Sequence, residues 1–229
     1  MQPVVLSSRR RPDVRLCVIG LACCLGVLPG HVAHAADPTV RGPMTDRPGP
    51  LSPKPVQVSG AEEPVVYQDP SAPLDFTFEY PRNWVTGVDR GSREPYWQVV
   101  ILGPRNEADS YSASLTVRLL PNPSVGGKFA DLEALVEGRK RQYGRQPGFL
   151  VLSEDQRDVA GVAAQEWMYR LSIPLPSHST SARPTAIQTH EVRLAVRGHL
   201  YELIYTADQQ DFDAYHRVFL HLLDSLTLR

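Results

Sequence analysis

After residue 75, apolar residues return at every second position in one segment after another. The cleanest segments are 76–80, 111–119 and 167–173, where aromatic or aliphatic residues alternate mainly with Thr, Ser, Arg or Glu. A period of two places successive side chains on opposite faces of a strand, so each segment predicts a strand with one buried face. The connections are short, and Arg197-Gly198 is typical of a hairpin turn. This pattern predicts an antiparallel sheet.

Two further segments have the helical period instead. Apolar residues of 129–143 and of 212–226 fall on one side when plotted at 100° per residue. Each helix then has one apolar face to bury, and the sheet offers the surface for it. We therefore predict an α+β sandwich, an antiparallel β-sheet of about six to eight strands flanked by two main helices.

The N-terminal 35 residues resemble a secretory signal peptide. Four arginines precede an apolar stretch at 16–28, Pro29-Gly30 ends that stretch, and Ala33-His34-Ala35 supplies small residues for cleavage. We expect cleavage after Ala35 and an extracytoplasmic, periplasmic or secreted, protein without a transmembrane span after cleavage. A retained membrane anchor is the alternative.

Cysteine and charge exclude several function classes. Cys17, Cys23 and Cys24 all lie inside the expected signal, so the mature chain has no disulfide and no thiolate nucleophile or ligand. Lipid attachment at Cys23 or Cys24 is disfavoured because the apolar run continues past both. A formal net charge of −1 gives no basic field for nucleic acid, which we do not expect as a partner.

A proline-rich segment separates the signal from the patterned region. Residues 36–73 contain nine prolines and few aromatic residues. Such a segment buries too little apolar surface to offset the entropy of ordering its backbone. We predict a disordered linker over 36–73, with a docking arm as the alternative, and one folded domain over 74–229.

Three motifs together resemble the PsbP family over residues of about 75–229. They are F-x-F-x-Y-P-x-x-W at 76–84, G-x-x-A-x-E-x-x-Y at 161–169, and L-Y-x-L-x-Y-T-A at 200–207 followed by F-x-x-Y-x-x-x-F at 212–219. Leu226 stands where the family commonly has an aromatic residue. The resemblance implies a PsbP-like sandwich and an accessory or assembly role at a membrane complex, which in plants is photosystem II. Nothing in this sequence requires photosynthesis.

The motifs are packing and turn signatures, and none is catalytic. The chain has no G-x-S-x-G, no phosphate-binding glycine-rich loop and no H-E-x-x-H. We therefore expect a non-enzymatic module that binds a protein partner in the cell envelope, without a cofactor. The alternatives are an extracytoplasmic domain for a small ligand or metal and an envelope hydrolase.

Candidate site residues fall into a basic, an acidic and a histidine group. Arg139, Lys140, Arg141 and Arg145 could dock an acidic partner or complement the helix C-terminus, and His178 lies in the polar loop 174–185. Asp208, Asp211 and Asp213 could bind a metal, although favourable charge at a helix N-terminus is the simpler interpretation. His216 and His221 point about 140° apart on a helix, and we expect His190 and His199 to be lone exposed histidines.

Overall fold

The computed structural model describes residues 63–68, 76–90, 96–121, 123–176 and 180–228 of the 229-residue chain. All of them belong to the compact unit Lys54–Arg229. The predicted signal peptide and His178 lie outside the described residues, as does most of the predicted linker. Within the described ranges, no helix has the length and apolar character needed to cross a membrane.

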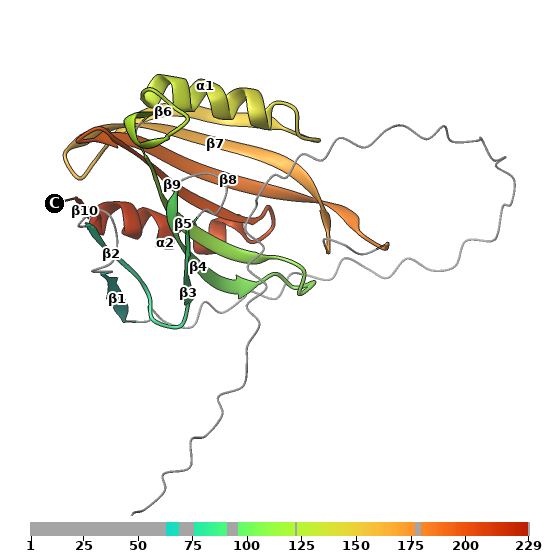
Figure 1. Ribbon diagram of the computed structural model, residues 1–229. Coiled ribbons are helices and arrows are strands. Elements are labelled where there is room, and N and C mark those ends of the chain that lie inside the picture. The colour runs from blue at the N-terminus through green and yellow to red at the C-terminus, as the bar shows by residue number, and fades with distance from the viewer. Residues whose placement is uncertain (1–62, 69–75, 91–95, 122, 177–179, 229) are drawn as a thin grey trace, which may run out of the picture. The chain divides into compact units, whose positions relative to one another are not determined.

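The described chain contains ten strands, two α-helices and one short 3-10 helix (Figure 1). In chain order they are β1 (Pro64–Tyr67), β2 (Phe76–Pro81), β3 (Val85–Arg90), β4 (Trp97–Arg105), β5 (Ser112–Leu120), η1 (Pro123–Val125), α1 (Leu132–Tyr143), β6 (Leu150–Val159), β7 (Val162–Leu175), β8 (Arg183–Val196), β9 (His199–Asp208), α2 (Phe212–Ser225) and β10 (Thr227–Leu228).

Seven strands form the main sheet, and every neighbouring pair is antiparallel. The strand order is β3-β4-β5-β9-β8-β7-β6, so β3 and β6 are its two edges. Two-residue turns join β6 to β7 and β8 to β9, at Ala160-Gly161 (φ 53° and 76°) and Arg197-Gly198 (φ 50° and 80°). Positive φ at both positions matches the right-handed twist of a hairpin, and glycine adopts that conformation without strain. The turn predicted at Arg197-Gly198 is therefore confirmed.

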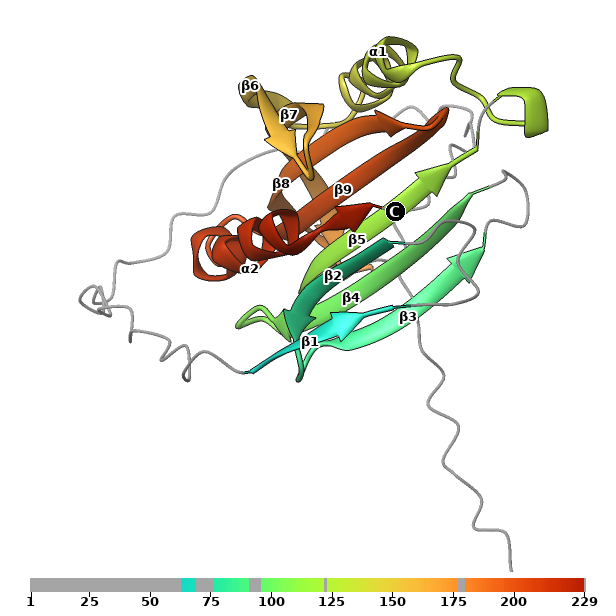
Figure 2. The same ribbon diagram turned by 90° about the vertical axis from the view of Figure 1, so that its left-hand side faces the viewer.

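The sheet is covered on both faces. Helix α1 lies over one face, while α2 and a small sheet of order β1-β2-β10 cover the other (Figures 1 and 2). Alternate residues of the central strands, among them Val117 and Leu203, pack against α2 and β2 and share one core with Phe219 of α2. The predicted α+β sandwich, with an antiparallel sheet flanked by two main helices, is confirmed.

The predicted linker 36–73 extends too far. Its residues 64–67 form β1, which pairs with β2 from Pro64 opposite Pro81 to Tyr67 opposite Phe78. The ring of Tyr67 stacks on Phe78 at 5.0 Å between centroids. The Val-Val-Tyr run at 65–67 therefore forms a strand because it packs against the aromatic residues of β2. The proline-rich composition of the whole segment gives no indication of this contact.

Two other expected boundaries move for the same reason. The loop predicted over 174–185 is shorter, because β7 continues to Leu175 and β8 begins at Arg183. The sequence favours short strands at 149–152 and near Val159, and these are parts of one ten-residue strand, β6. Pairing with a neighbouring strand extends both elements into polar sequence that lacks an alternating pattern of its own.

Candidate functional site

Polar side chains cross the whole main sheet in one row on the face that α1 covers. Residues that are directly opposite in antiparallel strands share a face, so the register identifies the members of the row. From β3 to β6 they are Asp89, Gln98, Arg118, Glu202, Arg193, Gln165 and Gln156. The first four are also linked directly by side-chain hydrogen bonds or ion pairs.

Glu202 is the centre of this row and is 0% exposed. Arg139 of α1 donates to both of its carboxylate oxygens, from Nε and Nη2 at 2.7 Å each, and Arg118 Nη1 lies 3.1 Å from Oε2. Arg193 Nε lies 3.5 Å from Oε1. Burial alone raises the pKa of Glu202, but the three guanidinium groups outweigh it and lower the pKa to about 2. Glu202 is therefore ionised at neutral pH.

A second buried carboxylate, Glu191, extends the network along β8. It forms an ion pair with Arg193, and Oε1 accepts hydrogen bonds from the hydroxyls of Tyr143 (3.2 Å) and Tyr169 (2.8 Å). The guanidinium of Arg193 also lies over the ring of Trp167, 5.1 Å from its centroid. Burial raises the pKa of Tyr169 well above its ordinary value, so its hydroxyl remains a donor. We call Arg118, Arg139, Arg193, Glu191 and Glu202 the ionic cluster.

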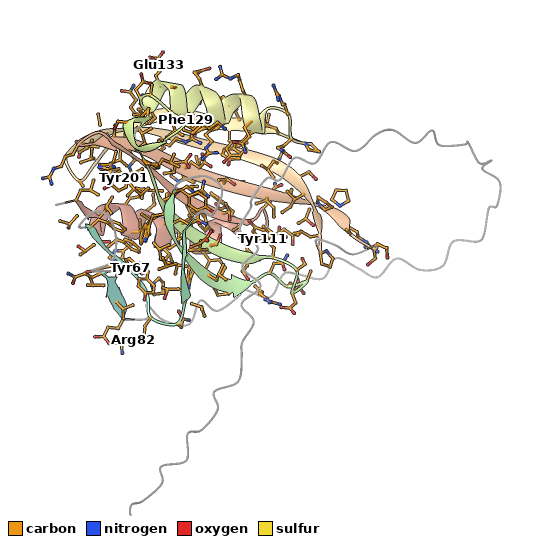
Figure 3. The ribbon with its side chains drawn as sticks, viewed as in Figure 1. Tyr67, Arg82, Tyr111, Phe129, Glu133 and Tyr201 are labelled. Carbon is orange, nitrogen blue, oxygen red and sulfur yellow. The ribbon has the colours of Figure 1, made fainter. Side chains whose placement is uncertain are left out.

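The ionic cluster determines how α1 sits on the sheet. Only Leu135 and Tyr143 of α1 are buried, so its apolar contact with the sheet is small. Figure 3 shows Phe129, just before the helix, on the side of α1 that faces the sheet, with Glu133 pointing away from it. The guanidinium of Arg139 lies 5.7 Å from the Phe129 ring centroid and is also paired with the carboxylate of Glu202. A cation held over a ring and paired with a carboxylate fixes one orientation of the helix.

The basic run predicted at the end of α1 therefore divides into separate roles. Arg139 points inward to Glu202, and Lys140 Nζ pairs with Glu154 Oε2 at 2.6 Å. Arg141 and Arg145 are exposed, and neither forms an ion pair with any residue that the structure describes. Only these two remain available for an acidic partner.

The opposite face of the sheet contains a histidine pair that sequence reasoning missed. His190 of β8 is 2% exposed, and its Nδ1 lies 2.8 Å from Nε2 of His216 on α2. Its Nε2 lies 2.6 Å from Oε1 of Glu166, which also pairs with Arg157 at 3.4 Å. The prediction of a lone exposed histidine is wrong for His190. The available signal was its parity with Val192 and Leu194, whose side chains face α2.

Both imidazoles of this pair are held neutral. Burial, opposed by the Glu166 carboxylate, lowers the pKa of His190 to about 4. Burial also lowers the pKa of His216, against the opposing effect of Asp213. The contacts are satisfied when His190 donates from Nε2 to Glu166 and accepts at Nδ1 from Nε2 of His216. The two facing nitrogens cannot both carry a proton without losing their hydrogen bond.

The three aspartates predicted as a metal candidate lie where α2 begins. Asp208 accepts from Asn106 Nδ2 at 3.0 Å, Asp211 is the N-cap residue, and Asp213 is in the first turn. Burial, together with the charge of Asp208, raises the pKa of Asp211. Across the described ranges, no three His, Cys, Asp or Glu side chains are grouped so that they could hold a metal ion. His221 is directed away from His216 and lies 2.7 Å from Glu79.

The edge strand β6 exposes three successive aliphatic residues. Leu150, Val151 and Leu152 are 47%, 38% and 43% exposed. Val151 pairs with Tyr169 and Ser153 with Met168, so Leu152 is the extra residue of a β-bulge. We call these three residues the aliphatic trio. The outer edge of β6 pairs with no other strand of the described chain.

Comparisons with known proteins return similar structures only. No family model matches the sequence, and no curated protein matches it. A Pseudomonas aeruginosa protein of unknown function is 16% identical, with a TM-score of 0.46 over 72% of this chain and 97% of its own. Cyanobacterial PsbP from Synechocystis is 15% identical, with a TM-score of 0.45 over 75% of this chain and 96% of its own. LpqN of Mycobacterium tuberculosis, involved in cell envelope biogenesis, is 16% identical, with a TM-score of 0.45 over 73% and 90%. A PsbP structure is therefore among the structures that this chain resembles.

Proposed function

We propose that this protein is an extracytoplasmic, non-enzymatic accessory module that binds and supports a protein complex of the cell envelope. The signal-like residues 1–35 and the proline-rich segment after them support the location. Among the strands that the structure describes, none pairs with the outer edge of β6, and this edge with its aliphatic trio is the observation that carries the binding role. An unpaired strand edge offers backbone hydrogen bonds to another chain, and exposed aliphatic side chains favour burial.

The charged residues support a binding role over an enzymatic one. Catalytic acids and bases must reach a substrate, and their pKa values lie near the working pH. Glu202 is fully buried, its pKa is about 2, and guanidinium groups occupy both of its oxygens. Glu191 is likewise enclosed by Arg193, Tyr143 and Tyr169. These groups stabilise the fold instead of presenting reactive atoms.

The test is crosslinking in native cells, followed by affinity capture. The full-length protein, tagged at its C-terminus, is compared with a Leu150→Lys/Leu152→Lys double variant and with Arg141→Glu/Arg145→Glu as a second surface. Deletion of 36–62 tests the linker while keeping β1, which begins at Pro64. We expect one reproducible envelope partner that is lost in the β6 variant. Absence of any partner above background contradicts the proposal.

Export has its own measurement. The N-terminus of the mature protein is determined by mass spectrometry after cell fractionation, with Ala36 expected as the first residue. An uncleaved protein in the cytosolic fraction contradicts the extracytoplasmic role.

A further inference from the structure

The structure points to the chemistry of the partner. We infer that β6 accepts an extended segment of a partner protein as an added strand, and that this segment is aliphatic opposite the aliphatic trio and basic opposite Asp155. This inference rests on the proposed binding role and specifies its docking surface.

The backbone of β6 is arranged to accept such a strand. The two-residue turn at Ala160-Gly161 is flanked by Val159 and Val162, which form a hydrogen-bonded pair in a hairpin of this kind. Alternation from that pair directs the N–H and C=O groups of Glu154, Gln156 and Asp158 away from β7. These groups are the ones an added strand would pair with.

The opposite edge of the sheet has a different character. Strand β3 has six residues against ten in β6, and short edge strands are one way in which proteins limit unwanted pairing. The exposed valines of β3, Val85 and Val88, are separated by Thr86 and Gly87, whereas the trio is continuous. The bulge at Leu152 turns an additional aliphatic side chain out of the regular pleat. Strand β6 is therefore the edge suited to a partner.

The charges along β6 indicate a basic partner. Glu154 is already paired with Lys140, Arg157 with Glu166, and Asp158 Oδ1 accepts from the Gly161 amide at 2.9 Å. Asp155 is exposed and forms no ion pair within the described ranges, and it lies opposite Glu166 on β7. A lysine or arginine on the added strand would supply the missing positive charge.

The same charges disfavour a second copy of this chain as the occupant. The polar half of β6 carries Glu154, Asp155 and Asp158 against the single Arg157, so pairing two copies along it would bring an excess of negative charge together. Like charges directly opposite each other destabilise strand pairs. A heterologous basic and aliphatic segment avoids that repulsion.

Synthetic peptides test this inference on the purified mature protein. The probe has eight residues, alternates Val and Thr, and carries two lysines at its N-terminus for an antiparallel strand or at its C-terminus for a parallel one. The matched control peptides have Glu in place of Lys. Binding is measured by fluorescence anisotropy, and amide exchange of Glu154, Gln156 and Asp158 is followed by NMR.

We expect one Lys peptide to bind and to slow exchange at those three amides. Leu152→Lys should weaken its binding at least tenfold. Asp155→Lys should reverse the preference, so that the corresponding Glu peptide binds more tightly. Val85→Lys, an exposed valine on the other edge, is the control and should leave binding unchanged. Thermal melts verify that each variant is folded.

Several outcomes overturn the inference. These are no binding by either Lys peptide, binding that Leu152→Lys leaves intact, or binding that Val85→Lys removes. Concentration-dependent dimerisation in sedimentation experiments that Leu152→Lys abolishes would assign the edge to a second copy. If native crosslinking captures a partner whose crosslinks lie away from β6, the proposed function stands and this inference fails. If a Lys peptide binds as expected but no partner is captured in cells, this inference is supported and the proposed function is contradicted.

Discussion

The two faces of the main sheet are stabilised by different physics, although the same strands contribute to both. Toward α2, alternate residues such as Leu203 and Tyr205 form an apolar and aromatic core with Phe219. Toward α1, Glu202 of β9 and Arg193 of β8 are as deeply buried but charged. Burial of apolar area stabilises the first face in proportion to the area removed from water. The second is stable only while each buried charge has its partner.

This difference extends to the two helices. Helix α2 buries Phe212, Phe219, Leu222 and Leu223, whereas α1 buries only Leu135 and Tyr143. The attachment of α1 therefore depends more on directional contacts, above all the two hydrogen bonds from Arg139 to Glu202. A hydrophobic face tolerates small shifts of a helix, and a bidentate ion pair does not.

The largest expected effect comes from neutralising the centre of the ionic cluster. Glu202→Gln leaves Arg118, Arg139 and Arg193 without their shared carboxylate, and should lower the free energy of unfolding by about 3–5 kcal/mol. Urea denaturation measures the change, with Glu154→Gln on the exposed Lys140 pair as the control, which should cost about 1 kcal/mol or less. A loss for Glu202→Gln no larger than that of the control contradicts this account of the α1 face.

A cavity on the other face should cost slightly less. Leu222→Ala removes a side chain that is 0% exposed between α2 and the sheet, and should lower the free energy of unfolding by about 2–5 kcal/mol. Leu150→Ala, which shortens an exposed side chain, is the control. A loss for Leu222→Ala no larger than that for Leu150→Ala would contradict the apolar packing of this face.

As pH falls, the two faces of the sheet should lose their contributions to stability at different pH values. The pKa of His190 is lowered to about 4, so its contribution is complete above the unfolded value of 6.5 and is lost as pH falls from 6.5 toward 4. The loss of stability is on the order of 3 kcal/mol. Glu166, Arg157, His216 and Asp213 face the histidine pair and also influence the pKa values of its imidazoles. The pKa of Glu202 is about 2, so its contribution is lost only as pH falls from 4.5 toward 2.

Chemical denaturation at a series of pH values checks this order. His190→Gln keeps a donor for Glu166 and should flatten the stability profile between pH 6.5 and 4, without changing it below pH 4. An unchanged slope in this variant would mean that other groups cause the loss.

The smallest expected effect concerns the neighbour of Arg139. Lys140→Ala breaks a surface pair with Glu154 and should lower the free energy of unfolding by less than about 1 kcal/mol. Arg139→Ala should lower the free energy of unfolding several times more than Lys140→Ala, because it removes two hydrogen bonds to a buried carboxylate. Thermal and urea unfolding of the two variants measure the ratio, and similar losses would contradict the inward role of Arg139.

The sequence by itself determined the local elements of this protein. Alternation predicted β5 and β7, the helical period predicted α1 and α2, and Arg197-Gly198 marked a hairpin turn, because each signal lies within a few successive residues. Parity along β8 also determined that Glu191 and Arg193 share a face. It did not show that both charges are buried.

Only the tertiary structure decided which of these residues meet. Arg139 and Glu202 are 63 positions apart, and His190 and His216 are 26 apart. Their contacts depend on the strand order β5-β9-β8 and on which helix covers which face. The same topology leaves β6 at an edge of the sheet, where no described strand pairs with its outer side. Local periodicity fixes the direction of a side chain from its own strand, whereas its partner is set by how distant segments pack.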